Sequence, residues 1–226
     1  MKRLIQLLSV QIGLPQILID TNFNGGEPTE WSTAFKKEPV TGAVWVARDN
    51  VSGDRQASIK THGGPDKAVC AYPFEHYSYW KQRLQLGDLN HGAFGENFTL
   101  RGQLEEECCI ADIVGFGDVV LQVSQPRPPC WRLARRWQKK DFAALMEETG
   151  RTGWYFRVIE EGYVEAGTSI RLLERPHPQC TVALAHRLVY QPLPNVDQIE
   201  ALASCAALSA SWRETLLKKL IDNKPS

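Results

Sequence analysis

The sequence lacks any run of about 20 apolar residues, the length that a helix needs to cross a bilayer. Its first residues, MKRLIQLLSVQIGLP, are cationic and then apolar, as in an export signal, but Gln6 and Gln11 interrupt the apolar run. No cleavage site of small residues follows. The segment Leu4–Val10 suits a first β-strand better. The sequence therefore predicts a cytoplasmic protein that does not bind a membrane.

No two cysteines stand at CxxC spacing, although six are present, at positions 70, 108, 109, 130, 180 and 205. Structural zinc sites and iron–sulfur clusters usually need such closely spaced thiols, so the sequence favours neither. The even count would allow disulfides, but the thiols of a cytoplasmic protein stay reduced. Most of these cysteines are expected to be buried as small apolar side chains. Cys70, within the run AVCAY, fits that role.

A net charge is also lacking, because 26 Lys and Arg residues balance 26 Asp and Glu residues. This balance argues against a protein that coats nucleic acid or an anionic membrane, although it leaves room for a local basic patch. Three catalytic motifs are missing as well. The sequence has no HExxH motif and no glycine-rich loop that ends in GK[ST], and VGFGDVV lacks the third glycine of a dinucleotide site.

Short segments rich in β-branched and aromatic residues fill the first three-quarters of the chain, separated by Gly, Asp, Pro and Asn. This pattern predicts a mainly β fold, either a sandwich or a barrel. The expected strands are Leu4–Val10, Val40–Ala47, Ala57–Thr61, Ala68–Tyr72, Asn97–Leu100, Val119–Ser124, Tyr155–Glu160 and Ser169–Leu173. Two helices are expected between them, one from Pro73 to a stop at Gly87 and one from an N-cap at Asp141 to Gly150.

The tail of the chain has a helical pattern from Val182 onward. Three short helices are expected: VALAHRLVY, closed by Pro192 and Pro194; NVDQIEALASC, capped by Asn195; and SASWRETLLKKL, with Ser211 and Glu214 at capping-box spacing. The predicted organisation is a barrel domain over residues 1–176, with its core at about 37–173, and a three-helix module over residues 181–226. The module either docks a partner or covers an edge of the barrel.

The segment SQPRPPCWRLARR, Ser124–Arg136, places one cysteine among three prolines and four arginines. Prolines fix the backbone and donate no hydrogen bonds, so the segment is not a central strand. It is expected to be stiff and to hold Cys130 in a set direction at the start of a helix. Cationic neighbours favour a thiolate, which suits a nucleophile, a sulfur carrier or a soft-metal ligand. The alternative is a structural cysteine beside a solvated basic helix.

Three other segments carry polar side chains that could bind a ligand. Their polar groups are His62, Asp66 and Lys67 in THGGPDKAV, Asn97 in GAFGENFTL, and Arg157 in GRTGWYFRVIEEG. Each also has a simpler explanation. Glycine and Pro-Asp suffice for a hairpin turn, an asparagine caps turns, and Arg157 could pair with Glu160 or Glu161.

Taken together, and in their order along the chain (THGGPDKAV, GAFGENFTL, VLQVSQPRPPCWRLARR and GRTGWYFRVIEEGYVEAGTSI), the four segments resemble the MOSC-domain family, which is named for the C-terminal domain of molybdenum-cofactor sulfurases. The resemblance covers about Lys37–Leu173, and the tail resembles a three-helix module found in one branch of the family. It implies a mixed β-barrel that holds a molybdenum cofactor, a pterin dithiolene with a terminal phosphate. It also implies reduction of N-hydroxylated base analogues such as 6-hydroxylaminopurine to amines, a detoxification reaction.

The same resemblance implies roles for particular residues. Cys130 would be the catalytic residue and the molybdenum ligand, and the cofactor-binding positions would be His62, Lys67, Asn97, Arg127 and Arg157. Because the sequence shows no flavin or iron–sulfur motif, a separate electron-donor protein is expected.

Three other functions stay open. Cys130 could carry sulfur as a persulfide, or the protein could store or deliver the cofactor without catalysis. The basic run RLARRWQKK could bind nucleic acid with Trp131 or Trp137 stacking on bases. The zero net charge disfavours the last.

Overall fold

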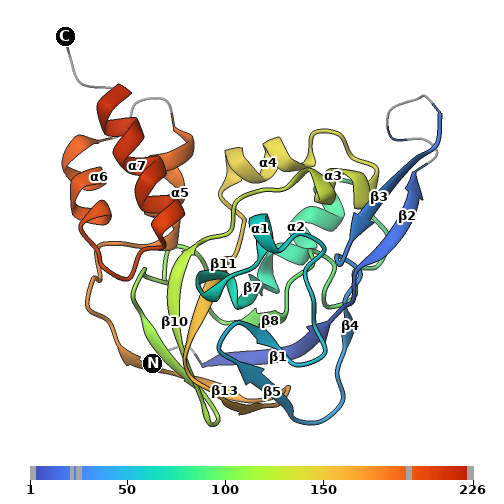
Figure 1. Ribbon diagram of the computed structural model, residues 1–226, viewed down its shortest axis with the longest axis horizontal. Coiled ribbons are helices and arrows are strands. Elements are labelled where there is room, and N and C mark those ends of the chain that lie inside the picture. Colours follow the sequence, from blue (N-terminus) through green and yellow to red (C-terminus); the bar gives the residue numbers. More distant parts are fainter. Residues whose placement is uncertain (1–3, 21–22, 24–26, 192–194, 223–226) are drawn as a thin grey trace.

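Seven strands close into a β-barrel, which is the centre of the computed structural model (Figure 1). The structure describes residues 4–20, 23, 27–191 and 195–222. The strands follow each other around the barrel in the order β13-β9-β10-β11-β7-β8-β1, and pairing between β1 and β13 closes the ring. Only β7 and β8 run parallel among the described strand pairs, so the barrel is mixed. The predicted fold class, mainly β with a helical tail, is confirmed.

The described elements have the following bounds. The strands are β1 (Ile5–Ile12), β2 (Gln16–Asp20), β3 (Thr29–Thr33), β4 (Glu38–Pro39), β5 (Val44–Ala47), β6 (Asn50–Val51), β7 (Val69–Pro73), β8 (Phe98–Arg101), β9 (Ile113–Phe116), β10 (Val119–Pro126), β11 (Trp154–Glu160), β12 (Gly162–Val164) and β13 (Ser169–Glu174). The helices are α1 (Ile59–His62), the 3-10 turn η1 (Pro65–Lys67), α2 (Glu75–Arg83), α3 (Trp131–Trp137), α4 (Phe142–Thr149), α5 (Val182–Tyr190), α6 (Val196–Ala203) and α7 (Ala210–Asp222). No described helix is long and apolar enough to cross a membrane.

The barrel interior is filled by large apolar side chains that alternate along the strands. Phe116 lies 5.4 Å from Phe98 and 5.7 Å from Phe156 between ring centroids, so three strands meet at one aromatic cluster. A second apolar cluster lies under α2, α3 and α4, where Trp80 donates a hydrogen bond of 2.6 Å from Nε1 to the Tyr72 hydroxyl. This second cluster fixes α3 beside the barrel, which positions the residues that follow Cys130.

The three tail helices pack on the barrel and share its core. Apolar side chains of α5, α6 and α7 belong to the same buried cluster as those of the barrel strands. Backbone hydrogen bonds cross the seam from Val182 N to Cys108 O (2.8 Å) and from Ser209 N to Ser124 O (3.0 Å). Strand β13 ends at Glu174 and α5 begins at Val182, so the predicted boundary falls in the connection between them.

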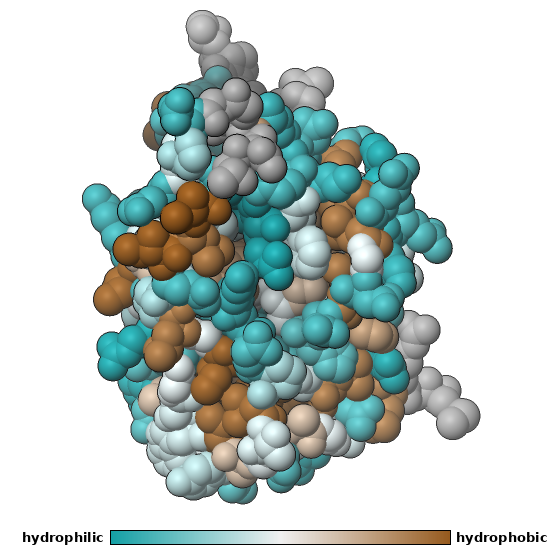
Figure 2. Space-filling view, turned by 90° about the vertical axis from the view of Figure 1, so that its right-hand side faces the viewer, coloured by the Kyte–Doolittle hydropathy of each residue, from teal (hydrophilic) through white to brown (hydrophobic). Residues whose placement is uncertain are grey.

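Strands β2 and β3 form a separate hairpin that projects at the right of Figure 1. On its inner side the hairpin packs against α3, where Asp20 accepts a hydrogen bond of 2.8 Å from Arg135 Nε. Ile17 and Ile19 are exposed on its outer side. Figure 2, which faces this side of the molecule, shows apolar groups scattered among hydrophilic ones. The end of β3 leads directly into one wall of the pocket described below.

Several predicted elements differ from the structure. The strand expected at Ala57–Thr61 is wrong: the segment overlaps the short helix α1 (Ile59–His62), none of whose residues is buried, so its β-branched residues contribute nothing to the sheet. Strand β9 is not among the strands expected from the sequence. In the structure, Gly117, with φ of 62°, makes the turn that joins β9 to β10.

Some helix ends also differ from the positions predicted from the sequence. Pro73 ends β7 instead of starting α2, and Gln85, with φ of 53°, ends that helix before Gly87. The cap of α7 is Ser209, which accepts a hydrogen bond from Trp212 N (3.3 Å), and not Ser211. The caps predicted at Asp141, Gly150 and Asn195 are confirmed in position. Pro192 and Pro194 lie outside the described residues.

The free energy of unfolding of the protein is expected to fall as the pH drops below about 6.5, in part because of His186. Its Nε2 is 2.7 Å from the Glu147 carbonyl oxygen, and burial lowers the pKa of His186 from 6.5. Below pH 6.5 the unfolded chain therefore binds a proton that the folded protein binds less readily, so stability is lost as the pH falls. Urea unfolding measured between about pH 5 and about pH 7 should show that the free energy of unfolding depends less steeply on pH in His186→Gln than in the wild type. An unchanged slope would contradict this.

Candidate functional site

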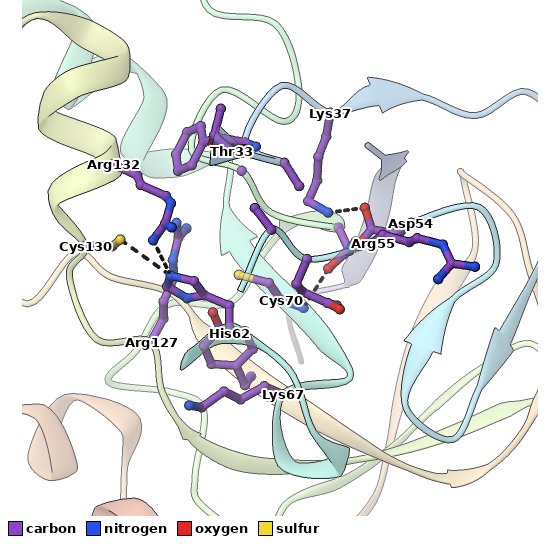
Figure 3. Close-up of a pocket in the computed structure, with 17 residues that line it drawn as sticks. Thr33, Lys37, Asp54, Arg55, His62, Lys67, Cys70, Arg127, Cys130 and Arg132 are labelled. Atoms are coloured by element: carbon purple, nitrogen blue, oxygen red, sulfur yellow. Dashed lines mark hydrogen bonds and ion pairs between the residues drawn. The ribbon is translucent and has the colours of Figure 1, made fainter. Parts of the chain in front are cut away.

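A pocket opens beside the barrel, between the chain that follows β3, helix α1 and the first turn of α3 (Figure 3). The space in the pocket, including open solvent at its mouth, is about 570 Å3. Figure 3 shows Cys130, His62 and Arg132 at one end, Lys37 and Asp54 at the other, and Cys70 between them. The lining residues are Thr33, Ala34, Phe35, Lys37, Asp54, Arg55, Gln56, Ala57, His62, Lys67, Cys70, Gly95, Asn97, Arg127, Cys130, Arg132 and Tyr155.

Cys130 reaches the pocket because the chain leaves the barrel in a stiff, extended segment. Strand β10 ends at Pro126, the next four residues have no regular structure, and Cys130 has φ of −130° and ψ of 137° just before α3. The thiol is partly exposed, while the other five cysteines are buried. The expected extended segment and helix start are thus confirmed, and Cys130 is not a core residue.

His62 lies against the thiol of Cys130. Its Nε2 is 3.7 Å from Cys130 Sγ and accepts a hydrogen bond of 3.2 Å from Arg132 Nη1. Burial, followed by the charges of Arg132, Arg127 and Lys67, lowers the pKa of His62 to about 4. At neutral pH the ring is therefore uncharged, with its proton on Nδ1 and its Nε2 lone pair directed at Arg132 and Cys130.

Arg127 brings a guanidinium with one unpaired nitrogen into the pocket wall. The residue is only 5% exposed, and its Nη1 has no hydrogen-bond partner among the described residues. Its guanidinium carbon lies 5.9 Å from the centroid of the Phe35 ring. Burial raises the pKa of both Cys70 and Tyr155, so these neighbours are neutral at pH 7, and the nearby carboxyl group that attracts the guanidinium is that of Glu96. A buried guanidinium nitrogen without a hydrogen-bond partner is costly, and an anion bound in the pocket would offset that cost.

The far end of the pocket is a closed polar network. Asp54 Oδ1 accepts hydrogen bonds from Gly13 N (2.8 Å) and from Lys37 Nζ. Asn97 Nδ2 donates to Asp54 Oδ2 at 3.0 Å, while Asn97 Oδ1 accepts from Cys70 N at 3.2 Å. Burial lowers the pKa of Lys37, and Asp54 opposes that effect. Asn97 therefore lines the pocket but already uses both ends of its amide to hold the wall together.

The two remaining sequence-predicted residues are placed differently. Lys67 lines the pocket and donates a hydrogen bond of 2.9 Å from Nζ to Thr61 O. Arg157 is not among the pocket-lining residues. It donates two hydrogen bonds to Asp66 Oδ1, at 2.7 and 3.0 Å, and one to Gln122. Arg157 thus pairs with neither Glu160 nor Glu161, and it anchors the loop that carries Lys67.

The pocket is strongly basic. Five cationic side chains line it: Lys37, Arg55, Lys67, Arg127 and Arg132. Asp54 is the only carboxylate among the described lining residues, and it is already paired with Lys37. Such a lining favours an anionic ligand with several oxygen acceptors.

Sequence analysis found His62, Lys67, Asn97, Arg127 and Cys130 but missed several other lining residues. Cys70 looked like a core cysteine because its neighbours in the chain are apolar, yet its side chain lines the pocket. Arg132 stood in the basic run after Cys130, so its spacing could have pointed to it. Lys37 and Asp54 belong to irregular segments that carry no motif, and only the fold brings them together.

Comparisons with known proteins point to one family. The MOSC domain family matches residues 58–171, and the YiiM-like, 3-alpha helix domain matches residues 181–220. The chain is 38% identical over 194 residues to protein YiiM of Escherichia coli, covering 85% of this chain and 86% of that protein. It also superimposes on the crystal structure of YiiM from Geobacillus stearothermophilus with a TM-score of 0.79 and 36% identity, covering 96% of this chain and 99% of the other.

A fungal relative is longer. The chain is 37% identical over 187 residues to a protein named Reductase from Gibberella moniliformis. The matched region covers 81% of this chain but only 32% of the fungal protein. About two-thirds of the fungal protein therefore lies outside the match.

Proposed function

The chain belongs to the MOSC domain family and carries its YiiM-like three-helix domain, and we propose that it is a molybdenum-cofactor-dependent reductase. Its proposed substrates are N-hydroxylated base analogues such as 6-hydroxylaminopurine, which it converts to amines. The name of the fungal relative, Reductase, supports the reaction class. Removal of such analogues would be a detoxification role in the cytoplasm.

The observation that carries the proposal is the unpaired Nη1 of Arg127 in a basic pocket that also presents a thiol. A molybdenum cofactor is an anion with a phosphate, so it would give Arg127 the acceptor that the described protein does not provide. Lys67 and Arg132 would add further donors at the same wall. Cys130 would supply a soft thiolate ligand, which suits a molybdenum–sulfur environment. The residues present therefore fit the group.

The overall reaction is R–NHOH + 2 e⁻ + 2 H⁺ → R–NH2 + H2O. The N–O bond breaks, and the oxygen leaves as water. The bound cofactor would supply a metal centre able to exchange two electrons and an oxygen atom. His62, uncharged and held by Arg132, would keep the thiol of Cys130 in place without adding a positive charge beside it. Stiff residues before Cys130 would reduce the ordering needed when the cofactor binds.

The electrons are proposed to come from a separate protein. The cysteine spacing in this chain is not that of an iron–sulfur protein. The donor must therefore bring its redox centre to the pocket from outside.

Turnover of 6-hydroxylaminopurine tests the proposal. Protein loaded with cofactor, and supplied with reduced methyl viologen, is expected to form adenine, measured by liquid chromatography. The cofactor-free protein is the control and should form none. Stoichiometric molybdenum without adenine would indicate a storage or delivery protein instead. Sulfane sulfur on Cys130 without bound molybdenum would indicate a sulfur carrier.

A further inference from the structure

Four cations lie at the pocket or beside it: Arg55, Lys67 and Arg132 line it, and Lys60 is on α1, two residues before the lining residue His62. Arg55 and Lys60 are exposed, and Lys67 and Arg132 are partly exposed. None of the four forms an ion pair within the described part of the chain, whereas the protein as a whole has no net charge. A positive rim on a neutral protein creates a local field that attracts an acidic surface.

Two exposed apolar side chains lie beside pocket-lining residues without lining the pocket themselves: Ile59 shares a neighbouring hollow with Arg55, and Trp131 contacts Arg132. Ile59 stands on α1, in the same short helix as His62, and is 74% exposed. Trp131 directly follows Cys130 and is 49% exposed. Large apolar and aromatic residues next to arginines are typical of protein interfaces, and aromatic residues and arginines often dominate their binding energy.

Trp131 is also held rigidly. The guanidinium carbon of Arg132 lies 4.6 Å from its ring centroid, and the Trp31 ring lies 5.7 Å away. Because Arg132 is in turn bound to His62 and to Ser32 O, neither side chain needs much ordering when a partner docks.

We propose that the rim formed by Arg55, Ile59, Lys60, Lys67, Trp131 and Arg132 docks an acidic electron-transfer protein that carries a flavin or an iron–sulfur centre. The inference rests on the proposed reductase function, which needs an external donor. A donor docked here would have its redox centre over the pocket mouth. The opposite charges would steer the encounter, and a small contact would allow the donor to leave after each delivery.

Two other surfaces are less suitable. The tail helix α7 exposes Leu217 and Ile221, but it carries both acidic and basic residues, so it offers no field of one sign. Nucleic acid would also bind to a cationic surface. However, Arg135 is paired with Asp20, and one face of Trp131 is covered by Arg132, which leaves fewer groups for phosphates and bases.

The test compares two donors and two matched variants. One donor is reduced methyl viologen, and the other is a reduced, acidic plant-type [2Fe–2S] ferredoxin. The rim variant carries Ile59→Ser and Lys60→Glu. The control carries Ile221→Ser and Lys218→Glu on α7, where Ile221 is 71% exposed. The rim variant is expected to raise KM for ferredoxin about tenfold and to weaken its dependence on ionic strength, with methyl viologen turnover unchanged. The control should match the wild type.

Other results would overturn the proposal. Equal KM values for ferredoxin in all three proteins, or a larger effect in the α7 variant, would remove the rim as the docking site. Adenine formation with methyl viologen reports on the reductase function alone, so its absence would reject that function separately. If adenine does not form, calorimetric titration of the three proteins with ferredoxin still tests whether the rim is the docking surface. If a single-stranded oligonucleotide binds the rim more tightly than ferredoxin does, and with a stronger dependence on salt concentration, then the occupant of the rim is nucleic acid and not a redox protein.

Discussion

Cys130→Ser is expected to lower the molybdenum content of the loaded protein at least about tenfold, and adenine formation with it. A serine hydroxyl is a hard oxygen that stays protonated at neutral pH, so it does not replace a soft thiolate at molybdenum. The substitution should leave the fold intact, because Cys130 is partly exposed and its thiol contacts only His62 Nε2, at 3.7 Å, among the described hydrogen-bond partners. Elemental mass spectrometry gives the molybdenum per chain.

Cys109→Ser is the matched control for loss of a thiol. Its Sγ donates a hydrogen bond of 3.4 Å to Pro178 O at the seam with the tail, and a serine hydroxyl can donate the same bond. Molybdenum content should stay at the wild-type level. Full loading of Cys130→Ser would leave the cofactor in place but remove Cys130 from the metal. No molybdenum in the wild type, despite a folded protein, would favour the sulfur carrier.

Arg127→Met is expected to have two opposite effects. The cofactor-free protein should gain about 1 to 3 kcal/mol of stability, because a buried cation with an unpaired Nη1 is replaced by an apolar side chain of similar length. Cofactor retention should fall by about tenfold or more, because the anion loses a charged hydrogen-bond donor. Urea unfolding of the cofactor-free protein and molybdenum per chain after gel filtration measure the two effects.

Arg157→Met provides the comparison. This arginine lies outside the pocket lining and pairs with Asp66, so its loss should reduce stability slightly and leave cofactor retention near the wild-type value. Equal loss of cofactor from both variants would show that Arg157 acts on the cofactor through the loop that carries Lys67. A less stable Arg127→Met protein would contradict the account of Arg127 as a buried guanidinium with one unpaired nitrogen.

The mainly β fold and the helical tail could be predicted because they depend on local patterns. Strand alternation, proline breaks and capping residues such as Asn195 act within a few residues of where they stand. The wrong strand at Ala57–Thr61 shows the limit of this approach. Its β-branched residues fit a strand locally, but no neighbouring strand is available there, and the segment forms the exposed helix α1 instead.

The site could be predicted only where a residue stood in a distinctive segment. Cys130 and His62 were both singled out, but nothing in a sequence shows that residues 68 positions apart come within 3.7 Å. The role of Cys70 depends on which side of β7 faces the pocket, and that of Lys37 on its pairing with Asp54. These relations are set by the closed barrel and not by any neighbouring residue.

The pairing of β1 with β13 also sets the order in which the protein can mature during translation. At about 5 to 20 residues per second, the ribosome releases β1 roughly 10 to 30 seconds before β13 emerges. Until Ser169 and Ile170 reach Gln6 and Ile5, the barrel is an open sheet with two unpaired edges. The nascent chain therefore exposes sheet edges that favour aggregation during most of its synthesis, and the barrel that supports the pocket closes only near the end.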